Sequence, residues 1–271
     1  MSAPTNTRAS FGGSIPEYYD RCLGTAYFGP PAAELARRVP ANPGGDVLEI
    51  ACGTGLVTRR LRARLDPSVR LVATDLSPAM LAYARAAVGE DGIQWGEADA
   101  SQLPFADESF AAVVCALGFM FVPDKALAFA QARRVLKPGG SLLFSVWDRI
   151  EDNPSGLHGG KALEGLAPGD PELVFRTPYE LADPALLRKL ATGAGFTDVR
   201  IDQVALEVTG VSARTIATGQ VRGTPRATLI QNKGFDLDQV IETVAAALAR
   251  SGGADPYRAP AKAIFVEARA P

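Results

Sequence analysis

The chain has 271 residues, of which 47% are hydrophobic, and a formal net charge of −2 at pH 7. This composition can bury a substantial core and favours one large domain with an appendage over two equal domains. The charge excludes a general polyanion-binding surface, and no cluster of lysine and arginine with interleaved aromatic residues indicates nucleic acid.

The sequence also argues against membrane and metal partners. No apolar run reaches about eighteen residues and residues 1–14 are polar, so we expect a cytoplasmic protein with no membrane partner. The three cysteines, Cys22, Cys52 and Cys115, lie far apart in a chain with a single histidine. We therefore expect buried free thiols, no disulfide and no metal site.

Strand and helix patterns alternate from Val47 to Trp147. Branched apolar runs predict strands at Val47–Ala51, Arg70–Asp75, Ile93–Glu97, Ala111–Ala116 and Ser141–Val146. Helical patterns cover Thr58–Leu65, Pro78–Val88 and Lys125–Leu136. This alternation predicts a parallel sheet wound with helices on both faces, which binds its ligand at the carboxyl ends of the strands. Four of the candidate residues fall there: Glu49, Asp75, Asp99 and Ala116.

The pattern changes after Trp147. A proline- and glycine-rich stretch, residues 151–177, is expected to be a substrate-side loop. A helix then begins with Asp183 as N-cap and Pro184 at its first position, followed by a sixth strand at Val199–Leu206. An insertion at residues 207–258 precedes the last strand, Ala263–Ala268. It contains one expected amphipathic helix, with an apolar stripe of Leu237, Val240, Ile241, Val244 and Leu248.

The segment Asp46-Val47-Leu48-Glu49-Ile50-Ala51-Cys52-Gly53-Thr54-Gly55 indicates a nucleoside-binding loop. Gly53 and Gly55 allow positive φ and a close approach of backbone to ligand. A dinucleotide fingerprint needs a third glycine where this chain has Thr58. The Glu49 carboxylate would repel a diphosphate but suits a cationic amino group, and Asp75 is placed to accept hydrogen bonds from ribose hydroxyls.

Four segments resemble, in order, the motifs of class I S-adenosylmethionine-dependent methyltransferases, in the branch of small-molecule and quinone C-methyltransferases (the methyltransferase type 11 family). Val47–Gly55 is similar to the first motif and Ala73–Leu81 to the second. Gly96–Ala100, followed by Leu103-Pro104-Phe105 and Asp107–Phe110, is similar to the third. Arg133–Gly140, leading into Ser141–Ser145, resembles the turn before the fifth strand.

The resemblance implies an α/β fold: a Rossmann-like, doubly wound, seven-stranded, mostly parallel sheet with an antiparallel last strand. It implies a helical lid at residues 1–40, a cofactor-binding core at residues 41–150, and a C-terminal half at residues 151–271 that includes the loop and the cap insertion. The cofactor is S-adenosyl-L-methionine and the product S-adenosyl-L-homocysteine. The residues expected to contact the cofactor are Tyr19, Glu49, Ala51, Gly53, Gly55, Asp75, Leu76, Met80, Asp99, Ala100 and Ala116.

Within this set, Leu76 and Met80 are expected to cover one face of the adenine. Asp99 accepts from its amino group and the Ala100 N–H donates to a ring nitrogen. The alternative is that Asp99 only caps the turn at Ser101. Tyr19 is the aromatic position that relatives place near the cofactor, although core packing of the aromatic residues between Pro16 and Phe28 is the simpler interpretation.

Methyl transfer needs alignment and exclusion of water, with a general base only where the nucleophile carries a proton. The candidates for that role are His158, which would otherwise be a solvent-exposed loop residue, and Asp148, which would otherwise cap a turn. Closure of flanking segments is expected to matter more than either. Phe119, Met120, Phe121 and Trp147 near the expected mouth favour a small, partly apolar or aromatic acceptor.

Two other functions stay open, a nicotinamide-binding reductase and a non-catalytic, methyltransferase-like binding protein. Three arginines in the insertion, Arg214, Arg222 and Arg226, are candidates to recognise an acidic group, against the simpler interpretation that they are solvated. The sequence does not fix whether oxygen, nitrogen, sulfur or carbon is methylated. It leaves the oligomeric state open, with a homodimer as one alternative.

Overall fold

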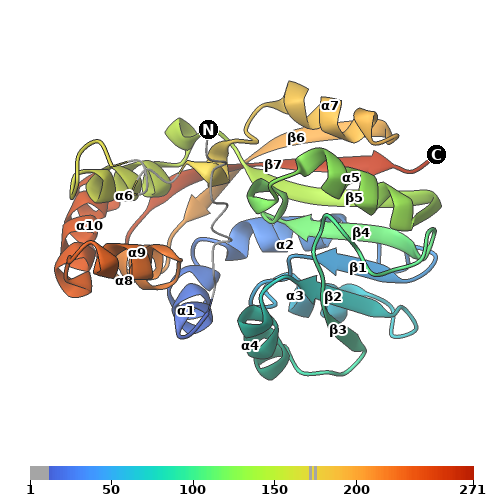
Figure 1. The fold of residues 1–271 in the computed structure, drawn as a ribbon, viewed down its shortest axis with the longest axis horizontal. Coiled ribbons are helices and arrows are strands. Elements are labelled where there is room, and N and C mark those ends of the chain that lie inside the picture. The colour runs from blue at the N-terminus through green and yellow to red at the C-terminus, as the bar shows by residue number, and fades with distance from the viewer. Residues whose placement is uncertain (1–11, 171–172, 174–175) are drawn as a thin grey trace, which may run out of the picture.

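A seven-stranded sheet organises the computed structural model, which describes residues 12–170, Leu173 and residues 176–271. The strand order is β3-β2-β1-β4-β5-β7-β6 (Figure 1). The strands are β1 (Val47–Ile50), β2 (Leu71–Asp75), β3 (Ile93–Glu97), β4 (Phe110–Ala116), β5 (Leu136–Trp147), β6 (Thr197–Val208) and β7 (Ala259–Arg269). The order reverses between β1 and β4, and ligands bind doubly wound folds at such a switch point.

Strand β7 is antiparallel to both of its neighbours. It pairs with β5 in a register that sets Phe144 opposite Val266, and with β6 in a register that sets Gln203 opposite Ile264. The pairs β1–β2, β1–β4, β2–β3 and β4–β5 are parallel. The predicted fold, a mostly parallel sheet with an antiparallel last strand, is confirmed.

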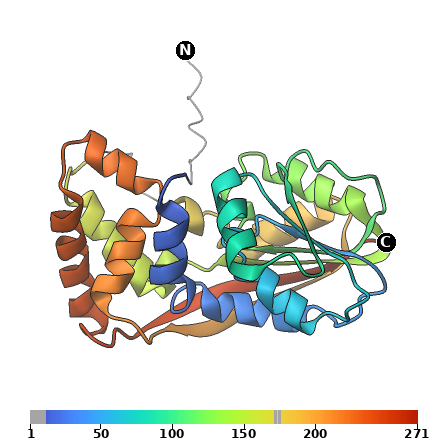
Figure 2. The same ribbon diagram turned by 90° about the horizontal axis from the view of Figure 1, so that it is seen from below.

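Helices lie on both sides of the sheet (Figure 2). They are α2 (Gly29–Arg38), α3 (Thr58–Arg64), α4 (Pro78–Val88), α5 (Lys125–Val135) and α7 (Pro184–Gly193). Helix α2 packs beside α3, and α5 packs beside α7. The predicted N-cap of α7 forms, because Asp183 Oδ1 accepts from the Ala185 N–H at 2.8 Å. The structure also shows Ser77 as the N-cap of α4, where Ser77 Oγ accepts from the Met80 N–H at 3.3 Å.

Four further helices form a cap beside the sheet: α6 (Pro154–Glu164), α8 (Ala213–Arg222), α9 (Arg226–Asn232) and α10 (Leu237–Gly252) (Figures 1 and 2). Helix α10 packs on α6 and α8 through the predicted apolar stripe. The expectation of a single helix in the insertion was wrong, because α8 and α9 are also helical. The expectation of a loop at residues 151–177 was wrong over α6; residues 171–172 and 174–175 lie outside the described residues.

The glycines of α6 explain the error in that stretch. A Cβ atom at Gly156 would lie 1.8 Å from the Tyr179 hydroxyl, and one at Gly159 would lie 1.9 Å from Gln220 Oε1. These glycines allow close packing inside the cap rather than a flexible loop. Helix α6 tolerates the low helix propensity of these glycines because neighbouring side chains pack into the space that they leave.

The N-terminal segment lies between the cap and the sheet domain. It contains α1 (Ile15–Tyr18), the π-helical turn η1 (Tyr19–Gly24) and α2; the part of the expected lid at residues 1–11 falls outside the described residues. Helix α1 contacts both α4 and α8. The described residues contain no helix long and apolar enough to cross a membrane.

The interior of the sheet domain is apolar. Phe119, Phe129 and Phe144 are fully buried and meet with ring centroids 4.9–5.4 Å apart. All three cysteines are free thiols; Cys52 and Cys115 are buried as expected, whereas Cys22 on η1 is only half-buried. This packed core fixes the strand ends that carry the candidate site.

Candidate functional site

The loop between β1 and α3 takes the backbone geometry predicted for it. Gly53 has φ +57° and Gly55 has φ +82°, and Ala51 also adopts a positive φ of 55°. A Cβ atom at Gly55 would lie 2.7 Å from Val88 Cγ2 on α4, so the loop has no room for a side chain there. Gly55 therefore keeps the loop pressed against α4, while Gly53 faces open space.

Asp75 holds this loop from the end of β2. Its Oδ2 atom accepts from the Gly53 N–H and its Oδ1 atom accepts from the Ser77 N–H, both at 2.8 Å. Burial raises the pKa of Asp75, and the N–H donors of Ser77 and Gly53 oppose that shift. A carboxylate oxygen accepts more than one hydrogen bond, so Asp75 retains capacity for hydroxyl donors.

Glu49, near the end of β1, is the acid of the site whose pKa is shifted most. Its side chain is 1% exposed, and its Oε2 atom has no hydrogen-bond partner among the described residues. Burial raises its pKa to about 8; the charge of Asp75 adds to the shift and Thr58 opposes it. An acidic oxygen that is buried and lacks a donor is costly unless a ligand supplies one.

A small cavity of about 50 Å³ opens beside Glu49. Tyr19 closes it from η1, and its ring stacks on Phe28 with centroids 4.6 Å apart. Burial raises the pKa of Tyr19, and the charges of Asp75 and Asp20 add to the shift. The lining residues are Tyr19, Phe28, Ala32, Glu49, Ala51, Cys52, Gly53, Thr54, Leu56, Val57, Ala116 and Leu117.

The structure therefore brings five of the predicted residues together around one cavity: Tyr19, Glu49, Ala51, Gly53 and Ala116. Pockets for small molecules usually enclose about 300–1,000 Å³. The observed cavity is much smaller, because the N-terminal segment packs over it.

The residues expected around adenine lie on the second and third strand ends. Leu76 is 44% exposed and therefore has apolar surface available to a ligand. Met80 is only 3% exposed and offers little surface. Asp99 Oδ1 accepts from the Ser101 N–H at 2.8 Å, which is the turn cap considered from the sequence. Ala100 is buried. Adenine recognition by Asp99 and Ala100 stays a prediction.

The two candidates for proton transfer have different surroundings. His158 lies on α6 and is half-buried, rather than in an exposed loop. Asp148 is fully buried directly after β5. Its carboxylate accepts from Gln203 Nε2 and from the Arg149 N–H at 2.8 Å, and Lys262 Nζ lies 3.4 Å away. These partners account for a structural role of the buried Asp148. Neither His158 nor Asp148 lines the cavity.

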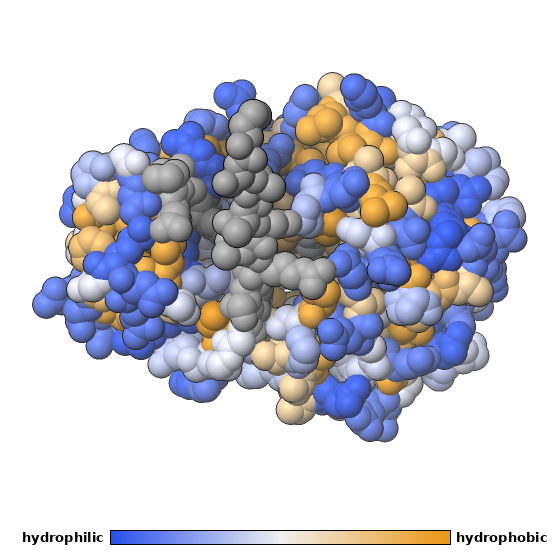
Figure 3. Space-filling model, viewed as in Figure 1, coloured by the Kyte–Doolittle hydropathy of each residue, from blue (hydrophilic) through white to orange (hydrophobic). Residues whose placement is uncertain are grey.

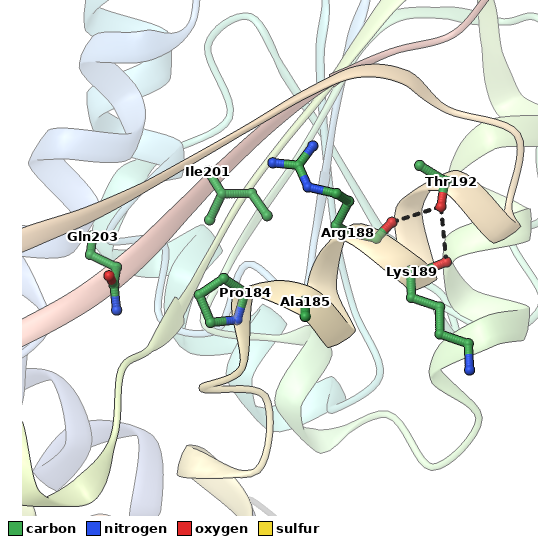
Figure 4. A pocket seen from close by; sticks show the side chains of 7 residues that line it. All are labelled: Pro184, Ala185, Arg188, Lys189, Thr192, Ile201 and Gln203. Atoms are coloured by element: carbon green, nitrogen blue, oxygen red, sulfur yellow. Dashed lines mark hydrogen bonds between the residues drawn. The ribbon is translucent and has the colours of Figure 1, made fainter.

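A larger groove of about 580 Å³ lies elsewhere, between α7 and the exposed side of β6 (Figure 4). It is lined by Pro184, Ala185, Arg188, Lys189, Thr192, Ile201 and Gln203, none of which is on a predicted motif. Figure 3 shows hydrophilic residues spread over both lobes of one face of the molecule. The smaller cavity is the candidate site, because Gly53 of the glycine loop and the buried Glu49 carboxyl line it, and Asp75 holds Gly53 in place.

The three arginines of the insertion separate into two kinds. Arg214 pairs with Glu242 at 2.7 Å and Arg222 pairs with Asp238 at 2.9 Å, both on α10. The Nε atom of Arg226 is buried, and burial lowers the pKa of its guanidinium to about 10. Tyr27 and Tyr179, whose hydroxyls lie 3.2 Å apart, counteract that shift electrostatically. Arg226 is therefore the one of the three that the cap encloses.

Sequence reasoning missed one residue that acts on the site through its neighbours. Asp20 of η1 accepts a hydrogen bond from Thr54 Oγ1 in the glycine loop at 3.1 Å. The available signal was that Asp20 directly follows Tyr19, the aromatic residue expected near the cofactor. Phe28, from the aromatic stretch considered in the sequence, and Leu117, next to Ala116, line the cavity too, whereas Ala32 of α2 is brought there only by the fold.

Comparison with known proteins agrees with this geometry. Residues 48–144 match the family model described as "Methyltransferase domain".

This part of the chain, residues 48–144, is similar to a methyltransferase domain.

The methyltransferase domain has curated relatives with different acceptors. A malonyl-[acyl-carrier protein] O-methyltransferase of Hahella chejuensis is 40% identical over 100 residues, which cover 37% of this chain and 36% of the relative. A ubiquinone/menaquinone biosynthesis C-methyltransferase of Teredinibacter turnerae is 39% identical over 106 residues, which cover 38% and 43%. The matched region thus spans less than half the length of these relatives.

The fold of the methyltransferase domain recurs in solved structures. One is the Haemonchus contortus phosphoethanolamine N-methyltransferase 2 in complex with S-adenosyl-L-methionine, which matches with a TM-score of 0.60 and 21% identity over 94% of this chain and 56% of that one. At this identity the likeness establishes the fold.

Proposed function

We propose that this chain is an S-adenosyl-L-methionine-dependent methyltransferase that acts on a small, partly apolar or aromatic acceptor. The observation that carries the proposal is the buried Glu49 carboxylate beside the cavity, with one oxygen lacking a donor among the described residues. A cationic α-amino group supplies both the missing donor and the opposite charge. A diphosphate would supply neither.

The residues present fit the rest of this cofactor. Asp75 would accept from the ribose hydroxyls, and Asp99 with the Ala100 N–H would read the edge of adenine. Leu76 would lie against the adenine ring, and Met80, which is only 3% exposed, would add a small contact. Ala51, Gly53, Gly55 and Ala116 provide the backbone surface, and Tyr19 would cover it. When bound, the cofactor supplies an activated methyl group on a sulfonium.

The protein then has to orient the acceptor and exclude water. Phe28 and Tyr27 are suited to this, because their rings lie 5.1 Å apart and Tyr27 meets Trp147 at 5.2 Å, forming an aromatic wall. His158 and Asp148 are the candidates to hold a proton released by an oxygen or nitrogen nucleophile.

The acceptor is proposed to be a small molecule held between this wall and the cap. The relatives and the structural neighbour are named for O-, C- and N-methylation, so the similarity leaves the methylated atom open. Arg226 is the arginine placed to meet an acidic group on such an acceptor. Residues 1–40 would act as lid, residues 41–150 as cofactor-binding core, and the cap insertion at residues 207–258 as the acceptor wall, in a cytoplasmic enzyme.

Isothermal titration calorimetry tests the cofactor. We expect micromolar binding of S-adenosyl-L-methionine and S-adenosyl-L-homocysteine, and no binding of NADH. Tight NADH binding with neither of the other two would replace the proposal by the reductase alternative. A screen of small aromatic acceptors with methyl-labelled cofactor then tests catalysis. Binding without transfer to any acceptor would favour a non-catalytic binding protein, and light scattering in the same buffer reports whether a homodimer forms.

A further inference from the structure

The π-helical turn η1 sits between the cap and the cofactor loop. Figures 1 and 2 both place the N-terminal helical segment between the cap helices and the sheet domain. η1 packs along α8 of the cap, and α1, which leads into it, contacts α8 and α4. π-helical turns are rare and occur frequently at functional sites.

On the cap side, Gly219 and Gly223 have no Cβ atom, so η1 packs closely against α8. A Cβ atom at Gly219 would lie 2.5 Å from Leu23 Cγ, and one at Gly223 would lie 2.8 Å from the Tyr19 backbone nitrogen. Gly219 on α8 and Gly223 at the C-cap of α8 lie one turn apart, so they present a flat surface to η1. Because no space separates the two elements, a movement of η1 toward or across α8 displaces α8 as well.

On the opposite side, the Asp20 carboxylate of η1 binds donors from three elements around the cofactor site. Asp20 Oδ1 accepts from Thr54 Oγ1 at 3.1 Å and from Arg59 Nη2 at 3.3 Å, and Oδ2 accepts from Tyr83 Oη at 3.3 Å. The donors come from the glycine loop, from α3 and from α4. The Asp20 side chain is 18% exposed, so these charge-assisted bonds are partly shielded from water.

We propose that Asp20 is a positioning residue that couples the cap to the cofactor loop. Through Thr54 it orders the loop that carries Gly53 and Gly55, and through η1 it keeps Tyr19 over the cavity. Opening the cavity then requires the three bonds to Asp20 to break, and α8 leaves together with η1. This proposal rests on the proposed function only for the identity of the ligand.

The test compares Asp20→Asn with the matched control Glu17→Gln. Glu17 lies on the adjacent α1 and pairs with Arg21 at 2.8 Å on the exposed surface, so its change removes the same charge without touching the loop. Hydrogen exchange of the ligand-free protein reports the coupling. We expect Asp20→Asn to lower protection in both η1 and α8, by about tenfold, at unchanged exchange of the central strands. Unchanged exchange of α8 would overturn the coupling.

Binding of S-adenosyl-L-homocysteine by calorimetry reports the positioning. We expect Asp20→Asn to raise the dissociation constant about tenfold and Glu17→Gln to leave it within about twofold. A double-mutant cycle with Thr54→Val should be non-additive, since both changes remove the same bond. Additive effects, or an Asp20→Asn affinity equal to that of the wild type, would refute the role.

The exchange experiment and a second variant, Tyr83→Phe, distinguish a failure of the coupling from a failure of the proposed function or of folding. If the wild-type protein binds no S-adenosyl-L-homocysteine, the proposed function fails, while the exchange experiment still decides the coupling. If Asp20→Asn does not fold, Tyr83→Phe removes one donor of the three and should show the same changes to a smaller degree; its exchange and affinity must then differ from those of Glu17→Gln.

Discussion

The pKa of Glu49 predicts that cofactor affinity depends on pH in a definite direction. With a pKa of about 8, the carboxyl of the free protein is ionised in about one molecule in 300 at pH 5.5 and about one in eleven at pH 7. If the cofactor amino group binds the ionised form, affinity should rise about 30-fold over that range. Calorimetry in two buffers of different ionisation enthalpy should also detect release of about one proton per cofactor at pH 6.

The matched variants are Glu49→Gln and Asp46→Asn. Glu49→Gln removes the titrating group, so its affinity should be low and flat with pH. Asp46→Asn changes the same charge at the start of β1, where Asp46 pairs with Arg70 on the surface, and should retain the slope. Affinity of the wild type that is constant from pH 5.5 to pH 7, with no proton released, would refute the reasoning and leave Glu49 without a role toward the amino group.

The same shift has a consequence for the free protein. Because the folded pKa lies above the ordinary value of 4.5, the contribution of Glu49 to stability is present at low pH and is lost as pH rises toward 8. The full shift corresponds to on the order of 5 kcal/mol. Glu49→Gln should therefore raise the Tm of the ligand-free protein more at pH 8 than at pH 5.5; an equal effect at both would contradict the shifted pKa.

Three further substitutions test the other site residues. Asp75→Ala should weaken cofactor binding by about 1.5–3 kcal/mol in calorimetry, because buried hydroxyls lose a charged acceptor; an unchanged affinity would mean that Asp75 only orders the loop. Asp99→Asn should weaken binding at constant Tm if Asp99 reads adenine, whereas a lower Tm at constant affinity identifies a turn cap. His158→Ala should reduce turnover by less than about a hundredfold, and a loss of a thousandfold with intact cofactor affinity would make His158 the proton acceptor.

The sheet domain could be predicted closely because its signals are local. The bounds of β3 and α4 agree with the sequence patterns, since alternating or branched apolar runs end at turns and at the Ser77 cap. The cap could not be predicted in the same way. Its glycines at Gly156 and Gly219 look like loop signals, yet they mark places where another element needs the space of a side chain.

The candidate site, too, could be predicted only where its residues lie in one local motif. Glu49 and Gly53 lie in one motif, and sequence alone placed them together. Ala32 reaches the cavity from α2, which no motif includes, so only the packed fold brings it there. The partners of Asp148 come from β6 and β7, which no local pattern links to the end of β5. A local pattern identifies a ligand-binding loop, but tertiary contacts decide which side chains enclose the ligand.

The small volume of the cavity has a consequence for kinetics. Under the proposed function, a cofactor is too large for a cavity of about 50 Å³, so its association would require Tyr19 and Phe28 to move and would be gated by the rate at which the N-terminal segment lifts. The demethylated product would leave by the same route. Its residence time, rather than the chemical step, would then set the rate of the catalytic cycle, and a faster enzyme would arise from a looser lid more readily than from a better base.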